Sequence, residues 1–201
     1  MERIQTIQQK VDDASTGFTI SIENILQVGF NHFRKAPGLF ILYSIVAAAA
    51  LSNPVSGLLL GGPVVAGYYI VIRGMKDQPS AGAWGFFRSF NKFGPFLLLN
   101  LLISAIVILG FLLLIIPGVF FSVSYLFSHL LVWFFDMEPS EAARLSRKMV
   151  SGNFTQILWL CLILAGINLL GALAFGIGLL ATIPFSACVI YAVFDDIIGI
   201  P

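Results

Sequence analysis

Few residues in the long apolar segments of this chain could do chemistry. His129 is the one imidazole between residues 93 and 135, and it precedes Asp136 by seven residues. On a helix that rises ~1.5 Å per residue, His129 would lie ~10 Å from the charged boundary that Asp136 marks. A histidine near a carboxylate can act in acid–base catalysis or in a proton relay. Because no acidic residue shares its depth, we interpret His129 as a neutral side chain that hydrogen-bonds a neighbouring helix.

Two cysteines and two asparagines are the other candidates. Cys161 and Cys188 are predicted at similar depth on adjacent helices. A redox pair is one interpretation, but cysteine in an apolar segment packs as a small apolar residue. Two cysteines without a histidine cannot complete a zinc site, so neither a metal nor a cofactor is expected. Asn100 and Asn168 are costly to bury unpaired, so we expect hydrogen bonds between helices, with a polar solute path as the alternative.

Motifs of known catalytic sites are absent from the sequence. It has no P-loop, no Gly-x-Ser-x-Gly turn and no His-Glu-x-x-His zinc motif. A rim site formed by His129 with Asp136 is the remaining catalytic arrangement to consider. We therefore expect a protein that is not an enzyme.

The elements that hold these residues follow from the composition. The 201 residues are 58% hydrophobic and 10% charged, with a formal net charge of +1. A water-soluble domain averages about 25% charged residues, and a disordered chain needs low hydrophobicity. A nucleic-acid-binding protein would carry a basic face. The composition excludes these classes and predicts an integral membrane protein.

Charge placement predicts an all-α architecture with six transmembrane helices. Residues 36–72, 93–135 and 149–194 contain no Asp, Glu, Lys or Arg. Each segment is about twice the ~20 residues that one span needs, so each should form a helical hairpin. Turns are expected at Ser52-Asn53-Pro54, between Gly110 and Pro117, and near Gly171 to Gly178, because Gly and Pro end or bend helices.

If every apolar segment is a hairpin, all charges lie on one side of the membrane. Cations flank the predicted spans on that side, and the positive-inside rule makes it cytoplasmic. Both termini are then cytoplasmic, in a cell (inner) membrane protein. Residues 1–17 are polar and show no signal peptide.

A segment of similar design precedes each hairpin. The three segments begin at Ser21, Ser80 and Ser140, at nearly constant spacing, and each serine is a good N-cap. This pattern favours a threefold repeat, with units of about 18–76, 77–137 and 138–195 in one membrane domain of residues 18–195, followed by a tail of 196–201. Apolar residues at helical spacing predict three amphipathic helices in the membrane interface.

These interfacial segments carry the residues that could bind lipids or a partner protein. Anchoring of the spans is the simpler interpretation, and recruitment of anionic lipid or a partner is the alternative. The candidate residues are Arg34, Lys35, Trp84, Arg88, Lys92, Arg144, Arg147 and Lys148.

Three short motifs resemble those of a broad group of bacterial six-helix membrane proteins. They are residues 113–119 (LLIIPGV), residues 141–146 (EAARLS) followed by Ser151-Gly152-Asn153, and Ile183-Pro184 followed by Tyr191. The group includes the YciC-like family and the membrane domain attached to some glycerophosphoryl diester phosphodiesterases. The resemblance covers about residues 20–195 and implies a bacterial inner-membrane protein. It implies no activity, because the group has no settled one. The phosphodiesterase's catalytic domain is absent from this sequence, so its chemistry cannot be carried over.

Two function classes agree with these features. The first is a non-enzymatic scaffold or accessory subunit that interacts with membrane lipids, a membrane-protein partner or further copies of itself, and not with nucleic acid. The alternative is a transporter or channel for a small or lipid-like solute. The repeat and the interrupted helices favour the alternative, and the absence of charges at membrane depth disfavours it.

Overall fold

The computed structural model describes residues 2–77 and 83–200, and in these residues every regular element is a helix. The elements in chain order are α1 (Glu2–Ser15), α2 (Ile22–Arg34), α3 (Pro37–Ala50), α4 (Pro54–Asp77), the 3₁₀ helix η1 (Ala83–Lys92), α5 (Phe93–Leu113), α6 (Ile115–Ser124), α7 (Ser128–Phe135), α8 (Pro139–Gly152), α9 (Phe154–Leu173) and α10 (Leu179–Ile198).

Five helical segments are long and apolar enough to cross a membrane. They are Pro54–Lys76, Trp84–Leu113, Ile115–Phe135, Phe154–Leu173 and Leu179–Ile198. The number rises to six if α2 and α3, which meet at 88°, form one broken span. α3 has 14 residues, and ~21 Å of helix is shorter than the ~30 Å hydrocarbon core. The chain is therefore a multi-pass membrane protein whose first apolar segment includes one short helix.

The helix breaks lie where Gly, Pro and Asn interrupt the apolar segments. α3 ends at Ala50 and α4 begins at Pro54, and α5 and α6 are separated by Leu114 alone. Between α9 and α10 the chain turns through Phe175 (φ 55°) and Gly176 (φ 77°), which both adopt left-handed conformations.

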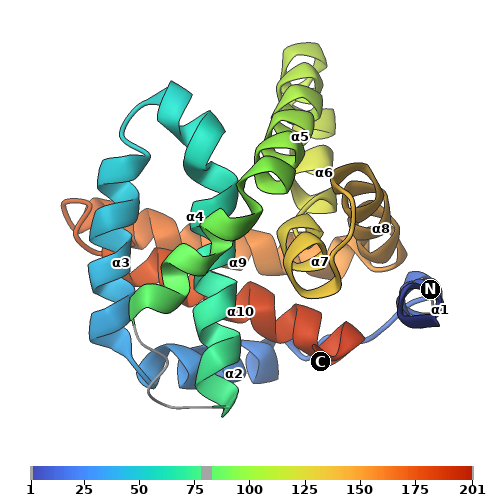
Figure 1. The fold of residues 1–201 in the computed structure, drawn as a ribbon, viewed down its shortest axis with the longest axis horizontal. Helices are drawn as coiled ribbons and strands as arrows, with labels where there is room; N and C mark the ends of the chain where they lie inside the picture. The colour runs from blue at the N-terminus through green and yellow to red at the C-terminus, as the bar shows by residue number, and fades with distance from the viewer. Residues whose placement is uncertain (1, 78–82, 201) are drawn as a thin grey trace.

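The helices do not run parallel to a single axis. In Figure 1, α3, α4 and α5 run up the view, whereas α9 and α10 run across it. α10 lies at the centre, where it contacts α1, α2, α3, α4 and α9. α2 crosses α10 at Gly29, where a Cβ atom would lie 2.5 Å from Cγ2 of Val189. The absence of a side chain at Gly29 thus permits the close crossing of these two helices.

The three segments that precede the apolar stretches adopt three different structures. α2 is an α-helix that bends sharply into α3, η1 is a 3₁₀ helix, and α8 is an α-helix that buries one face. The N-cap prediction is wrong for Ser140, because Glu138 is the N-cap residue of α8. Ser21 is the N-cap of α2 but makes no side-chain hydrogen bond there, and Ser80 lies outside the described residues. Similar spacing in the sequence has not produced similar local structure.

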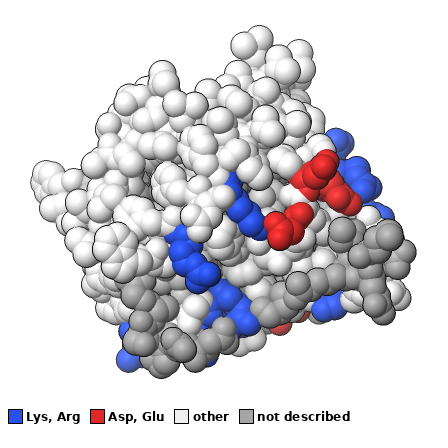
Figure 2. All heavy atoms as spheres, in the orientation of Figure 1, with Lys and Arg blue, Asp and Glu red and all other residues white. Residues whose placement is uncertain are grey.

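The contact of η1 with α3 and α4 is much more buried than helix α5. Aromatic rings fill the interior where η1 crosses α3 and α4, with Tyr43 stacked on Phe86 at 3.9 Å between centroids. In contrast, α5 buries only Phe96, Leu99 and Gly110. Figure 2 shows charged side chains restricted to the lower and right parts of the view, with uncharged surface above them. A wide apolar surface thus adjoins one charged end.

Candidate functional site: the charged end of the molecule

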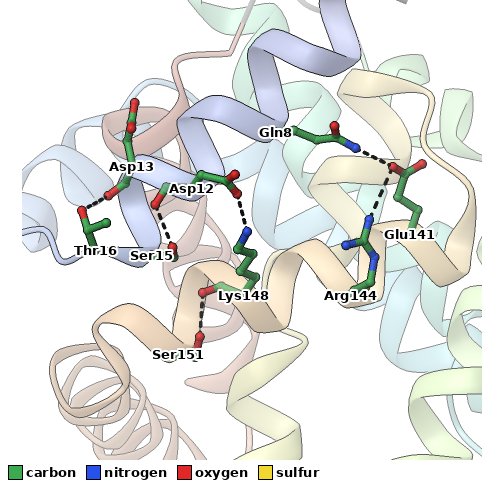
Figure 3. Close-up of polar contacts among 9 residues, drawn as sticks. All are labelled: Gln8, Asp12, Asp13, Ser15, Thr16, Glu141, Arg144, Lys148 and Ser151. Atoms are coloured by element: carbon green, nitrogen blue, oxygen red, sulfur yellow. Dashed lines mark hydrogen bonds and ion pairs between the residues drawn. The ribbon is translucent and has the colours of Figure 1, made fainter.

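The N-terminal helix α1 packs against α8 and the C-terminal part of α10, at the end of the molecule where the charged side chains gather. The sequence analysis did not predict this contact. Residues Ile7, Val11 and Ala14 of α1 are buried. Figure 3 shows Gln8 donating to Glu141 (3.3 Å) and Lys148 paired with Asp12 (2.5 Å). Lys10 also donates to the carbonyl of Ile198, at 2.5 Å. The available signal was the spacing of the three apolar residues on one helix face.

Four of the candidate cations have contacts with side chains of the protein itself. Lys148 pairs with Asp12, and Lys92 pairs with Asp136 at 2.5 Å. The guanidinium of Arg147 lies over the rings of Phe120 and Phe121, at 5.9 and 5.6 Å from their centroids. Arg144 lies 3.9 Å from Glu141 on its own helix. Arg144, Arg147 and Lys148 lie on the exposed face of α8, and the pair of Lys148 with Asp12 links this helix to α1. The placement of α8 in the membrane interface stays a prediction.

The other four candidates lie on the surface of α2, its C-cap and η1. Arg34 lies over the ring of Phe30, 5.7 Å from its centroid, and Trp84 is 82% exposed beside Phe87. Lys35 and Arg88 are exposed, and no hydrogen bond or ion pair to either is seen within the described residues. These four side chains are accessible to a lipid head group or a partner protein, and they stay candidates for such binding.

Lys92 and His129 belong to one stack of rings beside the α5–α7 contact. The ring of Phe96 stacks on His129 (6.2 Å) and on Trp133 (6.4 Å), and the ammonium of Lys92 lies 5.1 Å from the centroid of Trp133. Nε2 of His129 is buried and has no hydrogen-bond partner in the described chain. Asp136 pairs with Lys92 instead of His129, so the contacts give no support to acid–base chemistry between them.

The two asparagines form hydrogen bonds between helices. Nδ2 of Asn100 donates to the carbonyls of Gly57 (3.3 Å) and Leu58 (2.6 Å), which links α5 to α4. Nδ2 of Asn168 donates to Oγ of Ser186 across the α9–α10 contact, at 2.9 Å. Both arrangements satisfy amide donors between apolar helices, where an unpaired donor would be costly.

Both cysteines are free thiols, with Cys188 buried on α10 and Cys161 half-buried on α9. Within the part of the chain that the structure describes, no group of three or more His, Cys, Asp or Glu side chains is arranged to hold a metal ion.

A second charged cluster surrounds His32 at the end of α2. Lys76 pairs with Asp195, and the ring of His32 packs edge-on against Tyr191, 5.8 Å between centroids. Burial, together with repulsion from Lys35 and Lys76, lowers the pKa of His32 below its usual 6.5, against the opposing effect of Asp195. His32 is therefore held neutral inside a cationic neighbourhood.

Comparisons with known proteins add no identification to this geometry. No family model, no curated protein and no solved structure matches the chain. The class that the fold defines is a helical multi-pass membrane protein, and any finer assignment depends on its own residues.

Proposed function

We propose that the chain is a non-catalytic membrane-embedded scaffold or accessory subunit that interacts with lipids or a partner protein. The observation that carries the proposal is the exposure of α5 and α9. α9 buries only Ile157, Leu160, Leu164 and Gly171 of its 20 residues, and its bulky Trp159 and Leu169 are exposed. Since such surface is stable only against lipid or another apolar helix, these two helices offer interaction faces.

The proposed topology places six spans as three hairpins in a bacterial inner membrane. The exposed apolar tips at residues 112–116 and 173–177 would lie toward the far side of the membrane. The charged end with both termini would lie in the cytoplasm, with α2 and η1 in the interface. Membership of the YciC-like group is part of the same proposal, and it rests on the short motifs given above.

The test is extraction of the full chain into native-lipid nanodiscs, followed by mass spectrometry of co-purifying molecules. We expect a protein partner at fixed stoichiometry. Because Gly166 on α9 has open space around its Cβ position and Ala105 on α5 is exposed, Gly166→Leu and Ala105→Leu provide a matched pair. Loss of the partner in one variant alone identifies the binding helix. Catalytic turnover by the purified chain, or co-purification of bulk lipid with neither a protein partner nor an enriched lipid, contradicts the proposal.

One observation favours the alternative, a transporter or channel. Oδ1 of Asn168 and Oγ1 of Thr182 are buried without hydrogen-bond partners in the described residues, on either side of the α9–α10 contact. This amide oxygen and this hydroxyl are the unpaired polar groups that a solute would meet if the α9–α10 contact opened. Flux through reconstituted liposomes that disappears with Asn168→Leu would support this function. The absence of flux for ions, sugars and lipids would count against it.

A further inference from the structure

A groove of about 680 Å³ opens between the start of α5 and the segment that joins α7 to α8. One part of its wall is apolar and the other is charged. The apolar wall consists of Pro95, Leu98, Leu102 and Val132, and the polar end consists of Lys92, Asp136, Glu138 and Ser140. Leu98 is 60% exposed, so the apolar wall continues into the open surface of α5.

The polar end has unused hydrogen-bond acceptors and a net negative charge. The ammonium of Lys92 donates to Oδ1 of Asp136 (2.5 Å) and to the carbonyls of Trp133 (3.2 Å) and Val132 (3.4 Å). These contacts occupy its three hydrogens. Oδ2 of Asp136 is not used in this pair, and no ion pair to Glu138 is seen among the described side chains. The remaining carboxylate oxygens suit a cationic group that can donate hydrogen bonds.

Donors for an anionic group lie next to these acceptors. α8 begins at Pro139 and has 14 residues, and the N–H of Ala142 is bonded to the carbonyl of Glu138 at 2.9 Å. The N–H groups of Ser140 and Glu141 lie in the first turn, where a helix has no internal acceptor for them. With the hydroxyl of Ser140, which is exposed, these groups suit a phosphate oxygen.

We propose that this groove binds a phospholipid whose head group carries a primary ammonium, such as phosphatidylethanolamine. The ammonium donates to Asp136 and Glu138, the phosphate accepts from the start of α8, and an acyl chain follows Leu98 and Leu102. A choline head group has no N–H to donate, and an anionic head group without an ammonium would meet the unpaired carboxylates. The inference deepens the proposed function, on which it rests for its placement in a membrane.

The test uses the purified full chain in detergent, titrated separately with dioleoyl phosphatidylethanolamine, phosphatidylcholine and phosphatidylglycerol and followed by native mass spectrometry. We expect one tightly held phosphatidylethanolamine per chain, bound roughly tenfold more strongly than the other two lipids. Glu138→Gln should reduce this affinity about tenfold. Leu98→Trp, which fills the apolar part of the groove, should also reduce it. Glu23→Gln, which changes an exposed carboxylate on α2, is the matched control and should have no effect.

Equal binding of the three lipids, or an unchanged affinity for phosphatidylethanolamine in Glu138→Gln, would overturn the groove assignment. Preferential binding of phosphatidylglycerol would overturn it as well. These results concern the groove alone, and a protein partner that co-purifies in nanodiscs would still support the scaffold proposal. Conversely, a chain that binds phosphatidylethanolamine through Glu138 but also shows catalytic turnover would retain the site and refute the non-catalytic scaffold.

Discussion

Of the helices α5 and α8, the more apolar one is the less buried, which is the opposite of what is expected in water. α5 is almost entirely apolar between Phe93 and Leu113 but buries only three residues. α8 carries Glu141, Arg144, Arg147 and Lys148 and buries six residues, among them two alanines and one serine. Lipid tails are as apolar as leucine, so no hydrophobic force drives α5 into the protein interior.

The difference between α5 and α8 indicates that small side chains and paired polar groups, and not apolar character alone, favour burial of a helix in this protein. α8 packs against α1, α5, α6, α7 and α9, and its buried Ser146 has polar partners. Small side chains allow close helix contact, and satisfied polar groups fix its position. Changes at the buried face of α8 should therefore be costly, whereas comparable changes on the open faces of α5 and α9 should be tolerated.

Ser146→Ala should give the largest effect. Oγ of Ser146 donates to the carbonyl of Ser124 (2.8 Å) and accepts from the N–H of Phe127 (3.1 Å), where the chain leaves α6 and enters α7. Removing the hydroxyl leaves a buried N–H unpaired, so the free energy of unfolding should fall by about 2 kcal/mol. Denaturant unfolding in a mild detergent measures it.

The control is Ser151→Ala on the same helix. Its exposed hydroxyl bonds only to the carbonyl of Lys148, in its own turn, and we expect a change within about 0.5 kcal/mol. Equal losses in the two variants would show that the buried contact of α8 has no special weight.

Gly152 and Gly166 should respond to alanine with opposite signs. A Cβ at Gly152 would lie 2.5 Å from the carbonyl oxygen of Ser15, so α1 must shift. We expect a loss of about 1–2 kcal/mol and faster proteolysis of the chain near Gly17. Gly166 on α9 has nothing within 4 Å, and alanine there should stabilise the helix by about 0.5–1 kcal/mol. A loss of stability in both variants would contradict the expected difference between the α1–α8 contact and the exposed face of α9.

The part of the fold that the sequence predicts correctly is the part that depends on local signals in the chain. The charge-free segments and the breakers place the helix ends near Asn53, Leu114 and Phe175, because Gly and Pro act on the backbone within a few residues. The multi-pass all-helical class follows from the same pattern. The 88° bend between α2 and α3 and the crossing of α9 and α10 over the other helices depend on contacts that no local pattern encodes.

The candidate residues, too, divide into those predicted by local sequence and those that depend on contacts between distant segments. The sequence predicted Lys92 and Lys148 as candidates for binding lipids or a partner. Asp136 and Asp12 pair with them from positions 44 and 136 residues away. The polar groove was not predicted either, because the sequence analysis considered Asp136 only as a neighbour of His129 and Ser140 only as an N-cap. The start of α5 supplies the opposite wall of the groove. Pairing across the fold, which residue type and spacing do not specify, decides which charges remain available.

Lowering the pH should weaken the charged end and leave the open helices unaffected. The fold lowers the pKa of His32 below its usual 6.5, so the unfolded chain binds more protons in this range. Stability is therefore retained above about pH 6.5 and lost as the pH falls below it. Thermal unfolding in detergent between pH 7.5 and pH 5.5 measures the slope, which His32→Gln should reduce. An identical slope in that variant would assign the effect to another group.

The smallest expected effect concerns the ion pair that joins α1 to α8. The side chains of Asp12 and Lys148 are 57% and 44% exposed, so water and salt screen their attraction. A double-mutant cycle with Asp12→Asn and Lys148→Gln should give a coupling of about 0.2–1 kcal/mol, decreasing with added salt. A parallel cycle of Asp12→Asn with Arg147→Gln, whose guanidinium lies over phenylalanine rings, should give almost none. A coupling well above this range would mean that charge holds α1 in place. A value within it leaves the buried Ile7 and Val11 as the main source of docking, so salt alone should not release α1 from α8.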